Sequence, residues 1–314
     1  MIRRLPRVRE QSLDLAQMLK SIVAIHALVP DDAFTAGALG TERAGSGVVI
    51  GDGLVLTIGY LITEADRIWL RSADGRLTPG HALAIDQETG FGLVQALGDL
   101  DLPALELGSS ADAKLGDAVV VAGGDANQFV RATIVARQTF AGYWEYLLDE
   151  ALFTAPAHPL WGGAGLIDAD GRLIGIGSLL VQQMTETGET RDANMVVPID
   201  LLKPILEDMM AYGQSRRPPR PWLGLFSADH EGGVMVVSLA EDGPAASAGV
   251  KPGDVIAGVG DREVAHLADF YRAVWDGATP GDEIALHIIR DDRNLVVRVR
   301  SANRTDLLKK PRLH

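Results

Sequence analysis

The sequence contains no cysteine and no long uninterrupted hydrophobic run. The absence of cysteine excludes a disulfide, a thiol nucleophile and a cysteine-ligated metal. The longest apolar stretch, residues 47–62, carries Asp52 and four glycines. It is therefore too short and too broken to cross a bilayer as a helix.

Aromatic residues and positive charge are also scarce. Aromatics make up 5% of the 314 residues, and 29 Lys and Arg stand against 42 Asp and Glu, a net charge of −13. Such a surface disfavours nucleic acids and anionic membranes, whose phosphates need basic partners. A hydrophobic content of 47% with 35 glycines indicates a globular protein of about two domains, built from short strands and tight turns.

The first twenty residues begin with a basic stretch, as a signal peptide does. Glu10, Asp14 and Lys20 then interrupt the apolar core that a signal peptide needs, and no small-residue cleavage site follows. The segment therefore predicts a cytoplasmic protein, with the periplasm less favoured.

Short β-like runs separated by Gly and Asp turns dominate the chain from Ser21 onward. The apolar spacing predicts helices over Ser12–Lys20 and Asp200–Tyr212, the latter with Asp200 as N-cap and Gly213 as the C-terminal stop. Between two late strands, residues 182–192 predict a polar loop.

Composition divides the chain into five parts. We expect an N-terminal segment (1–20), a β domain (21–213), a proline-rich basic linker (214–220), a compact second domain (221–302) and a charged tail (303–314). No internal repeat is visible.

The second domain resembles a PDZ domain over its full length. The resemblance is carried by WLGL (222–225), GPAASAGVKPGDVI (243–256), GVGDREV (258–264) and a helical stretch over 267–275. It implies that Trp222, Leu223, Gly224 and Leu225 form a carboxylate-binding loop and that Phe226 lines the side-chain pocket. Without a Cβ, Gly224 would let backbone N–H groups approach a peptide C-terminus.

The first domain resembles the HtrA family of trypsin-like serine proteases, which joins a double β-barrel to PDZ domains. The matching segments are GSGVVI (45–50), LVLT (54–57), ADGR (73–76), DLPALELGS (101–109), LGD (115–117), DGRLIGI (170–176) and VPI (197–199). The resemblance implies a mostly β fold, a trypsin-like double β-barrel followed by an α/β PDZ domain.

The positions that the resemblance assigns to the catalytic triad carry other residues. Tyr60 stands at the histidine position, Gly90 at the aspartate position and Gly162 at the serine position. A phenol has a pKa near 10 and is a poor general base at neutral pH, and glycine supplies neither nucleophile nor carboxylate. We also expect Tyr60, Phe91, Leu160 and Trp161 to fill the former cleft with apolar bulk.

These substitutions predict a pseudoprotease rather than an enzyme. Its PDZ groove would bind peptide or protein C-termini, and its barrels would serve as a scaffold. The alternative is an active serine endopeptidase whose catalytic residues are relocated or supplied by a partner subunit. His158 with Ser46 or Ser178 is the conceivable relocated pair. A third hypothesis has the groove closed, with the protein acting through its barrel surface.

No cofactor is expected. No spacing of His, Asp and Glu matches a metal site, and no glycine-rich loop between a strand and a helix favours a nucleotide. The resemblance to HtrA proteins implies a homo-oligomer, a trimer formed through the barrels.

Overall fold

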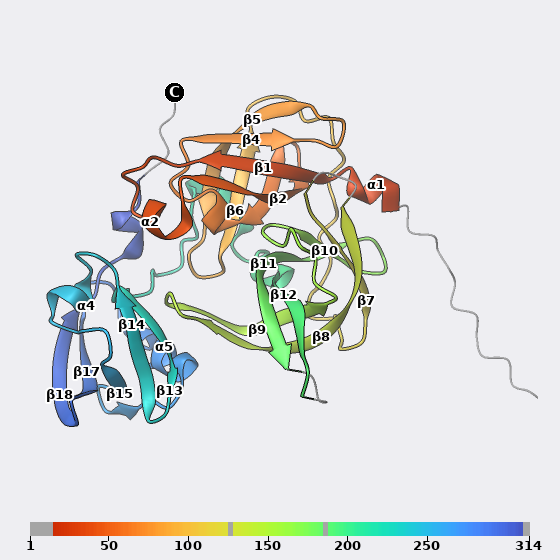
Figure 1. Cartoon of the computed structure of the whole chain (residues 1–314). Helices are drawn as coiled ribbons and strands as arrows, with labels where there is room; N and C mark the ends of the chain where they lie inside the picture. Colours follow the sequence, from red (N-terminus) through yellow and green to blue (C-terminus); the bar gives the residue numbers. More distant parts are fainter. Residues whose placement is uncertain (1–14, 125–127, 185–187, 310–314) are drawn as a thin grey trace, which may run out of the picture.

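The computed structural model describes residues 15–124, 128–184 and 188–309 (Figure 1). Two closed antiparallel β-barrels are followed by a smaller domain with one sheet and two helices. The predicted fold class, mostly β with a double barrel before an α/β domain, is confirmed.

The first barrel has the strand order β1-β2-β3-β6-β5-β4. All five residues of β3 are buried in its centre. Strand β4 alternates exposed and buried residues, so it faces solvent on one side. The six strands are β1 (Ile22–Leu28), β2 (Glu42–Gly51), β3 (Leu54–Ile58), β4 (Arg67–Arg71), β5 (Leu77–Ile85) and β6 (Phe91–Ala96).

The second barrel has the order β10-β11-β12-β9-β8-β7. Its longest strands, β8 and β9, form a hairpin whose last pair is Gly142 with Tyr146, so that only residues 143–145 make the turn. The six strands are β7 (Ala118–Ala122), β8 (Phe129–Gly142), β9 (Tyr146–Ala155), β10 (Gly165–Ile167), β11 (Leu173–Met184) and β12 (Thr190–Pro198).

The C-terminal domain has the sheet order β13-β14-β15-β17-β18, with β16 paired to β15. Helix α5 (Leu267–Trp275) buries Leu267, Phe270, Tyr271 and Val274 at helical spacing against the sheet. The other elements are β13 (Leu225–His230), β14 (Gly233–Leu239), α4 (Pro244–Ser247), β15 (Val255–Val259), β16 (Arg262–Glu263), β17 (Glu283–Arg290) and β18 (Arg293–Arg300).

Short helices connect these units. They are α1 (Leu15–Leu19), α2 (Ala36–Leu39), η1 (Gly59–Leu61), η2 (Ile199–Leu201), α3 (Leu206–Tyr212) and η3 (Arg304–Leu307). The predicted first helix is present as α1, and the first three residues of its predicted span lie outside the described part of the chain. The predicted polar loop at 182–192 is largely a hairpin, because β11 and β12 extend into it from both sides.

The predicted helix over 200–212 is wrong at its start. Residues 199–201 form the 3₁₀ turn η2, and α3 begins only at Leu206 with Ile205 as N-cap. Pro204 disfavours helical geometry at Lys203, and Asp200 instead accepts a hydrogen bond from the Ala111 N–H at 2.7 Å. The predicted end is confirmed, since Gly213 caps α3 at φ 74°.

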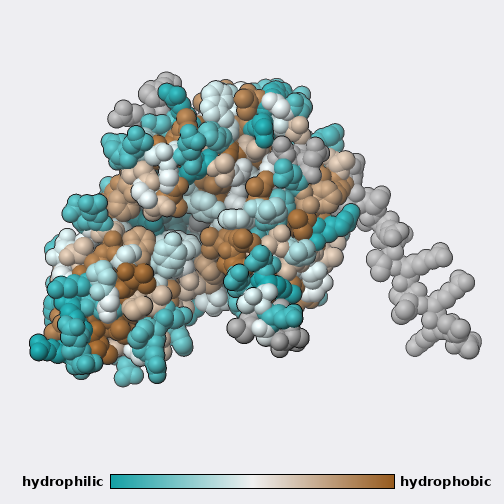
Figure 2. Space-filling model, viewed as in Figure 1, coloured by the Kyte–Doolittle hydropathy of each residue, from teal (hydrophilic) through white to brown (hydrophobic). Residues whose placement is uncertain are grey.

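The C-terminal domain packs directly on the barrels. The tip of the β8–β9 hairpin reaches toward β13 and α5 (Figure 1). Nearby, the rings of Phe34 and Trp222 meet edge to face at 5.9 Å. In the space-filling view, hydrophilic side chains cover much of the outer edge of this domain, with hydrophobic residues between them (Figure 2).

Candidate functional site

A cleft of about 820 Å³ opens beside η1, where the first barrel faces the loop before β10. Tyr60 and Leu61 line it from the first barrel, and residues 159–162 line it from the second. The lining is largely apolar, so the cleft offers an extended polypeptide a hydrophobic surface with few polar groups.

Tyr60 and Gly162, two of the three positions assigned to the triad, lie together in this cleft. The Tyr60 hydroxyl donates to the Ser178 carbonyl at 2.8 Å. A Cβ added at Gly162 would lie 2.8 Å from the Tyr60 hydroxyl oxygen. The phenol therefore occupies the space that a side chain at residue 162 would need. Burial raises the pKa of Tyr60, which keeps it protonated.

Gly90 lies behind the cleft and not in its lining. Its carbonyl accepts a hydrogen bond from the Gly59 N–H at 2.7 Å, so it supports the start of η1. A Cβ at Gly90 would lie 3.0 Å from the Tyr146 hydroxyl, which itself donates to the Thr89 carbonyl at 2.6 Å. Tyr146 from the second barrel thus covers the place of a side chain at residue 90.

The conceivable relocated pair, His158 with Ser46 or Ser178, is not formed. His158 is 1% exposed, and its Nδ1 accepts a hydrogen bond from the Leu160 N–H at 3.0 Å. The Ser46 hydroxyl, also buried, accepts from the Gly124 N–H at 2.7 Å. Burial lowers the pKa of His158, against hydrogen bonds from its neighbours. Within the described residues, no hydroxyl-to-imidazole hydrogen bond is found.

The prediction that four apolar side chains fill the cleft is wrong. Tyr60, Leu160 and Trp161 line its wall and leave it open, and Phe91 lies fully buried in the core of the first barrel. Phe91 is the first residue of β6, whose first four residues are all buried, and its ring belongs to the hydrophobic core of the barrels.

Replacing Tyr60 by phenylalanine is expected to lower the free energy of unfolding by about 1–3 kcal/mol, because the buried Ser178 carbonyl loses its donor. Urea unfolding measures this loss. Tyr212→Phe is the matched control. Because Tyr212 is 60% exposed, the loss of its hydroxyl should change the free energy of unfolding little. Equal effects of the two substitutions would show that the Tyr60 hydrogen bond contributes nothing.

A second site lies in the C-terminal domain, at the predicted carboxylate-binding loop, Trp222–Leu225 (the carboxylate loop below). Its backbone N–H groups converge on the side chain of Glu145, at the tip of the β8–β9 hairpin. The N–H groups of Leu223, Gly224 and Leu225 donate to the Glu145 carboxylate at 3.0, 2.7 and 2.9 Å. Gly224 has φ 77°, a left-handed conformation that turns these groups toward one point.

The other two predicted binding residues have different surroundings. Phe226 contacts the ring of Tyr143 from the hairpin tip, with ring centroids 6.1 Å apart. Trp222 is 6% exposed, packs on Phe34 of the barrel domain and pairs with Ala302 through two backbone hydrogen bonds of 2.9 Å. Trp222 therefore joins domains and does not face the groove.

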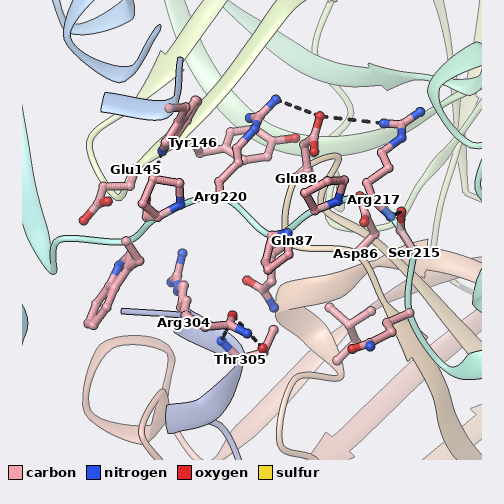
Figure 3. A pocket seen from close by; sticks show the side chains of 18 residues that line it. Asp86, Gln87, Glu88, Glu145, Tyr146, Ser215, Arg217, Arg220, Arg304 and Thr305 are labelled. Carbon is pink, nitrogen blue, oxygen red and sulfur yellow. Dashed lines mark hydrogen bonds and ion pairs between the residues drawn. The ribbon is translucent and has the colours of Figure 1, made fainter. Parts of the chain in front are cut away.

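The surroundings of Glu145 act on its charge in opposite directions. Burial raises the pKa of its carboxyl to about 7, while the three N–H donors and the Arg304 guanidinium oppose this rise. Figure 3 shows Glu145 at the edge of an interdomain pocket, with its carboxylate turned away from Arg220. In the same pocket, Arg220 and Arg217 both pair with Glu88, at 2.7 and 3.6 Å.

Sequence reasoning missed the residues that connect the barrels to the PDZ domain, Glu145, Tyr271 and Arg304. It also missed Tyr146, which connects the second barrel to Thr89 of the first. One signal was available. Residues 143–146 read Tyr-Trp-Glu-Tyr, an unusual aromatic cluster in a chain with five tyrosines and five tryptophans. Glu145 gave no such signal, because its partners follow it by 78–80 positions.

Two kinds of feature are absent from the described residues. No group of three or more His, Asp or Glu side chains is placed to hold a metal ion. No helix in the same residues has the length and hydrophobicity that crossing a membrane requires.

Comparison with known proteins identifies both domains. The trypsin-like peptidase domain matches residues 45–176, and the PDZ domain matches residues 221–300. The chain is 28% identical over 271 residues to a probable periplasmic serine endoprotease, DegP-like, of Pseudomonas fluorescens, covering 80% of this chain and 54% of the relative. It is 23% identical to the serine protease Do-like HtrA of Bacillus subtilis, covering 82% and 63%.

The chain spans about half the length of the Pseudomonas relative. Among solved structures, the HtrA-type protease AlgW with a decapeptide has a TM-score of 0.55 at 21% identity, covering 95% of this chain and 99% of that one. That likeness shows a shared fold.

Two predictions are corrected by these findings. The prediction of a non-catalytic protein that is no enzyme is contradicted, because the relatives are named serine endoproteases. That prediction took the residues at three positions as evidence about the activity of the whole chain. The prediction of a cytoplasmic protein is contradicted as well, because relatives are named periplasmic. It depended on the first twenty residues, most of which lie outside the described structure.

Two barrels of trypsin-like fold, a PDZ domain after them and relatives that align over four fifths of the sequence lead to one conclusion. The chain belongs to the HtrA family of trypsin-like serine proteases with a C-terminal PDZ domain.

Proposed function

We propose that this chain is a serine-type endopeptidase of the periplasm that acts on polypeptides and whose PDZ domain binds peptide or protein C-termini. The names of the relatives support the activity and the compartment. The observation that carries the proposal is the open, apolar cleft beside Tyr60 and Gly162, in a fold shared with HtrA-type proteases. A cleft of this size accommodates an extended chain segment.

Hydrolysis of a peptide bond by this mechanism also needs a nucleophile and a base. Tyr60, Gly90 and Gly162 do not provide them, and the described residues of this chain hold no hydroxyl-to-imidazole hydrogen bond. We therefore infer that the hydroxyl and the base come from two different copies of the chain, which meet at the cleft of a homo-oligomer. Acyl transfer needs a hydroxyl within hydrogen-bond reach of a base, and two copies meeting at the cleft would satisfy that requirement.

The test is hydrolysis of an unfolded substrate, such as reduced casein, together with labelling by a fluorophosphonate. If a partner completes the site, turnover per subunit should rise with protein concentration until the oligomer is fully formed. The absence of both turnover and labelling at every concentration would overturn the proposal.

Two substitutions show whether any turnover belongs to this cleft and not to a contaminating protease. Ala44 is exposed and lines the cleft, so Ala44→Trp should block substrate and abolish turnover. Ala169 is exposed in the turn between β10 and β11, and no residue within six positions of it lines the cleft, so Ala169→Trp should leave turnover unchanged. Turnover that persists in Ala44→Trp would show that the activity does not come from this cleft.

A further inference from the structure

The carboxylate loop of the PDZ domain is already occupied by a carboxylate of the same chain. We propose that the tip of the β8–β9 hairpin, residues 143–145, is an internal competitor for the PDZ groove, so that a polypeptide C-terminus binds only after displacing Glu145. This inference rests on the proposed binding of C-termini and adds its regulation.

The contacts of the hairpin tip have the spacing of a bound peptide. The Glu145 carboxylate accepts from the N–H of Leu225 at 2.9 Å, and two residues earlier the Tyr143 carbonyl accepts from the N–H of Ser227 at 2.9 Å. The residue pairs 145–225 and 143–227 run in opposite directions, so the tip lies antiparallel to β13. An incoming peptide adds to the edge of a PDZ sheet in this manner, with its terminal carboxylate in the loop.

Further contacts hold the tip from its other sides. The Tyr271 hydroxyl, on α5, accepts from the Glu145 N–H at 3.1 Å and donates to the Gly142 carbonyl at 2.7 Å. Arg304 donates to the Trp144 carbonyl at 3.4 Å and places its charge near the Glu145 carboxylate. Leu147, on β9, is 7% exposed and packs within the hydrophobic core of the PDZ domain. The hairpin therefore fills both the edge of β13 and the space beside α5.

The backbone of the turn is strained, and the contact with the PDZ domain offsets the energy of this strain. Glu145 has φ 61°, a left-handed conformation that glycine adopts easily and other residues rarely adopt. Three-residue hairpin turns commonly place glycine at such a position. The presence of glutamate here is explained by its carboxylate, which four hydrogen bonds from the loop engage.

Hydrogen exchange tests the internal contact without any peptide. In the native chain, the amide hydrogens of Leu223, Gly224 and Leu225 should exchange slowly, because the Glu145 carboxylate accepts all three. Glu145→Gly removes the carboxylate and also relieves the left-handed strain, so the barrel should remain folded. In this variant the three amides should exchange about 5- to 150-fold faster, the range of a typical coupling between sites.

Glu150→Ala is the matched control, because Glu150 lies on β9 and its carboxylate pairs with Arg137 at 2.7 Å, away from the PDZ domain. It should leave the exchange of the three amides unchanged. Glu145→Ala keeps the strain while it removes the carboxylate, and it should release the amides as Glu145→Gly does. Equal exchange in the native chain and in both Glu145 variants would overturn the proposal.

Peptide binding gives the second measurement. The probe is a library of fluorescein-labelled heptapeptides with free C-terminal carboxylates, with the corresponding C-terminal amides as controls. Peptides that bind Glu145→Gly should bind the native chain about 5- to 150-fold more weakly, since only the fraction with a displaced hairpin is competent. Equal affinity for both proteins would contradict the proposal.

The two measurements separate this proposal from the proposed function. If no peptide binds any variant but the Glu145 substitutions speed up exchange, the internal contact stands and the proposed recognition of C-termini fails. If peptides bind all variants equally and exchange does not change, recognition stands and the internal competitor is disproved.

Discussion

Replacing Gly163 by alanine is expected to lower the free energy of unfolding by more than about 4 kcal/mol, an exceptional loss for a single methyl group. Gly163 has φ 78°, which alone costs an alanine about 1–2 kcal/mol. A Cβ there would also lie 1.9 Å from the Ser46 carbonyl oxygen and 2.5 Å from the Thr57 hydroxyl oxygen. These atoms belong to β2 and β3, so the clash would separate the two barrels.

Gly75→Ala is the control that isolates the clash from the backbone strain. Gly75 has φ 84°, close to that of Gly163, but a Cβ there would meet nothing within 4 Å. Its substitution should therefore cost about 1–2 kcal/mol, the strain alone. Urea unfolding of both variants gives the comparison, and similar losses for the two would contradict the predicted close contact between the barrels.

Replacing Asp254 by alanine is expected to destabilise the PDZ domain by about 3–5 kcal/mol. Asp254 is fully buried, and its two carboxylate oxygens each accept a hydrogen bond of 2.6 Å from Arg290. The Lys251 N–H donates to the same carboxylate at 2.8 Å. Alanine would remove the acceptor of the Lys251 N–H and of the Arg290 Nε, while the Arg290 Nη2 keeps the Gly249 carbonyl at 2.9 Å. Removing one partner of a buried ion pair in this way is strongly destabilising.

The same pair gives a pH dependence. Burial disfavours the charged form of Asp254, but the hydrogen bonds from Arg290 and Lys251 outweigh it and hold the pKa below its ordinary value of 3.8. A lowered folded-state pKa stabilises the domain above pH 3.8, and this contribution is lost as the pH falls through the lowered value. Asp254→Ala should therefore show a shallower loss of stability in acid than the native chain.

Glu283→Ala is the control for the ion pair. Glu283 pairs with Arg298 at 3.0 Å, but both side chains are more than half exposed, so the substitution should cost less than about 1 kcal/mol. Thermal unfolding of the two variants measures the difference. A loss for Asp254→Ala as small as that for Glu283→Ala would show that Arg290 remains solvated when its partner is removed.

Local patterns in the sequence predict much of the fold. The stretch at 267–275 forms helix α5, and Gly213 ends α3, because amphipathic spacing and a glycine stop depend on neighbours along the chain. The start of α3 was mispredicted because Asp200 has a distant partner, the Ala111 N–H, that no local pattern reveals. Tertiary contacts decide such boundaries.

The candidate sites, too, were predictable only where motifs along the chain define them. The positions of Tyr60 and Gly162 follow from motif order, and the structure places them in one cleft. The open state of that cleft could not be predicted, since the burial of Phe91 in the barrel core, away from the cleft, depends on tertiary packing. The contact of Glu145 with the carboxylate loop could not be predicted from the sequence. It joins two domains through a turn whose conformation is visible only in the structure.

In the proposed competition, the position of Glu145 on a three-residue turn sets a threshold for any ligand of the PDZ domain. A tethered group competes at an effective concentration, which is on the order of millimolar for short flexible connections. A hairpin closed by the pairing of Gly142 with Tyr146 holds its carboxylate in place more firmly than a flexible tether would. Under the proposed competition, weak and abundant chain ends would be excluded, and a ligand with additional contacts along β13 would bind.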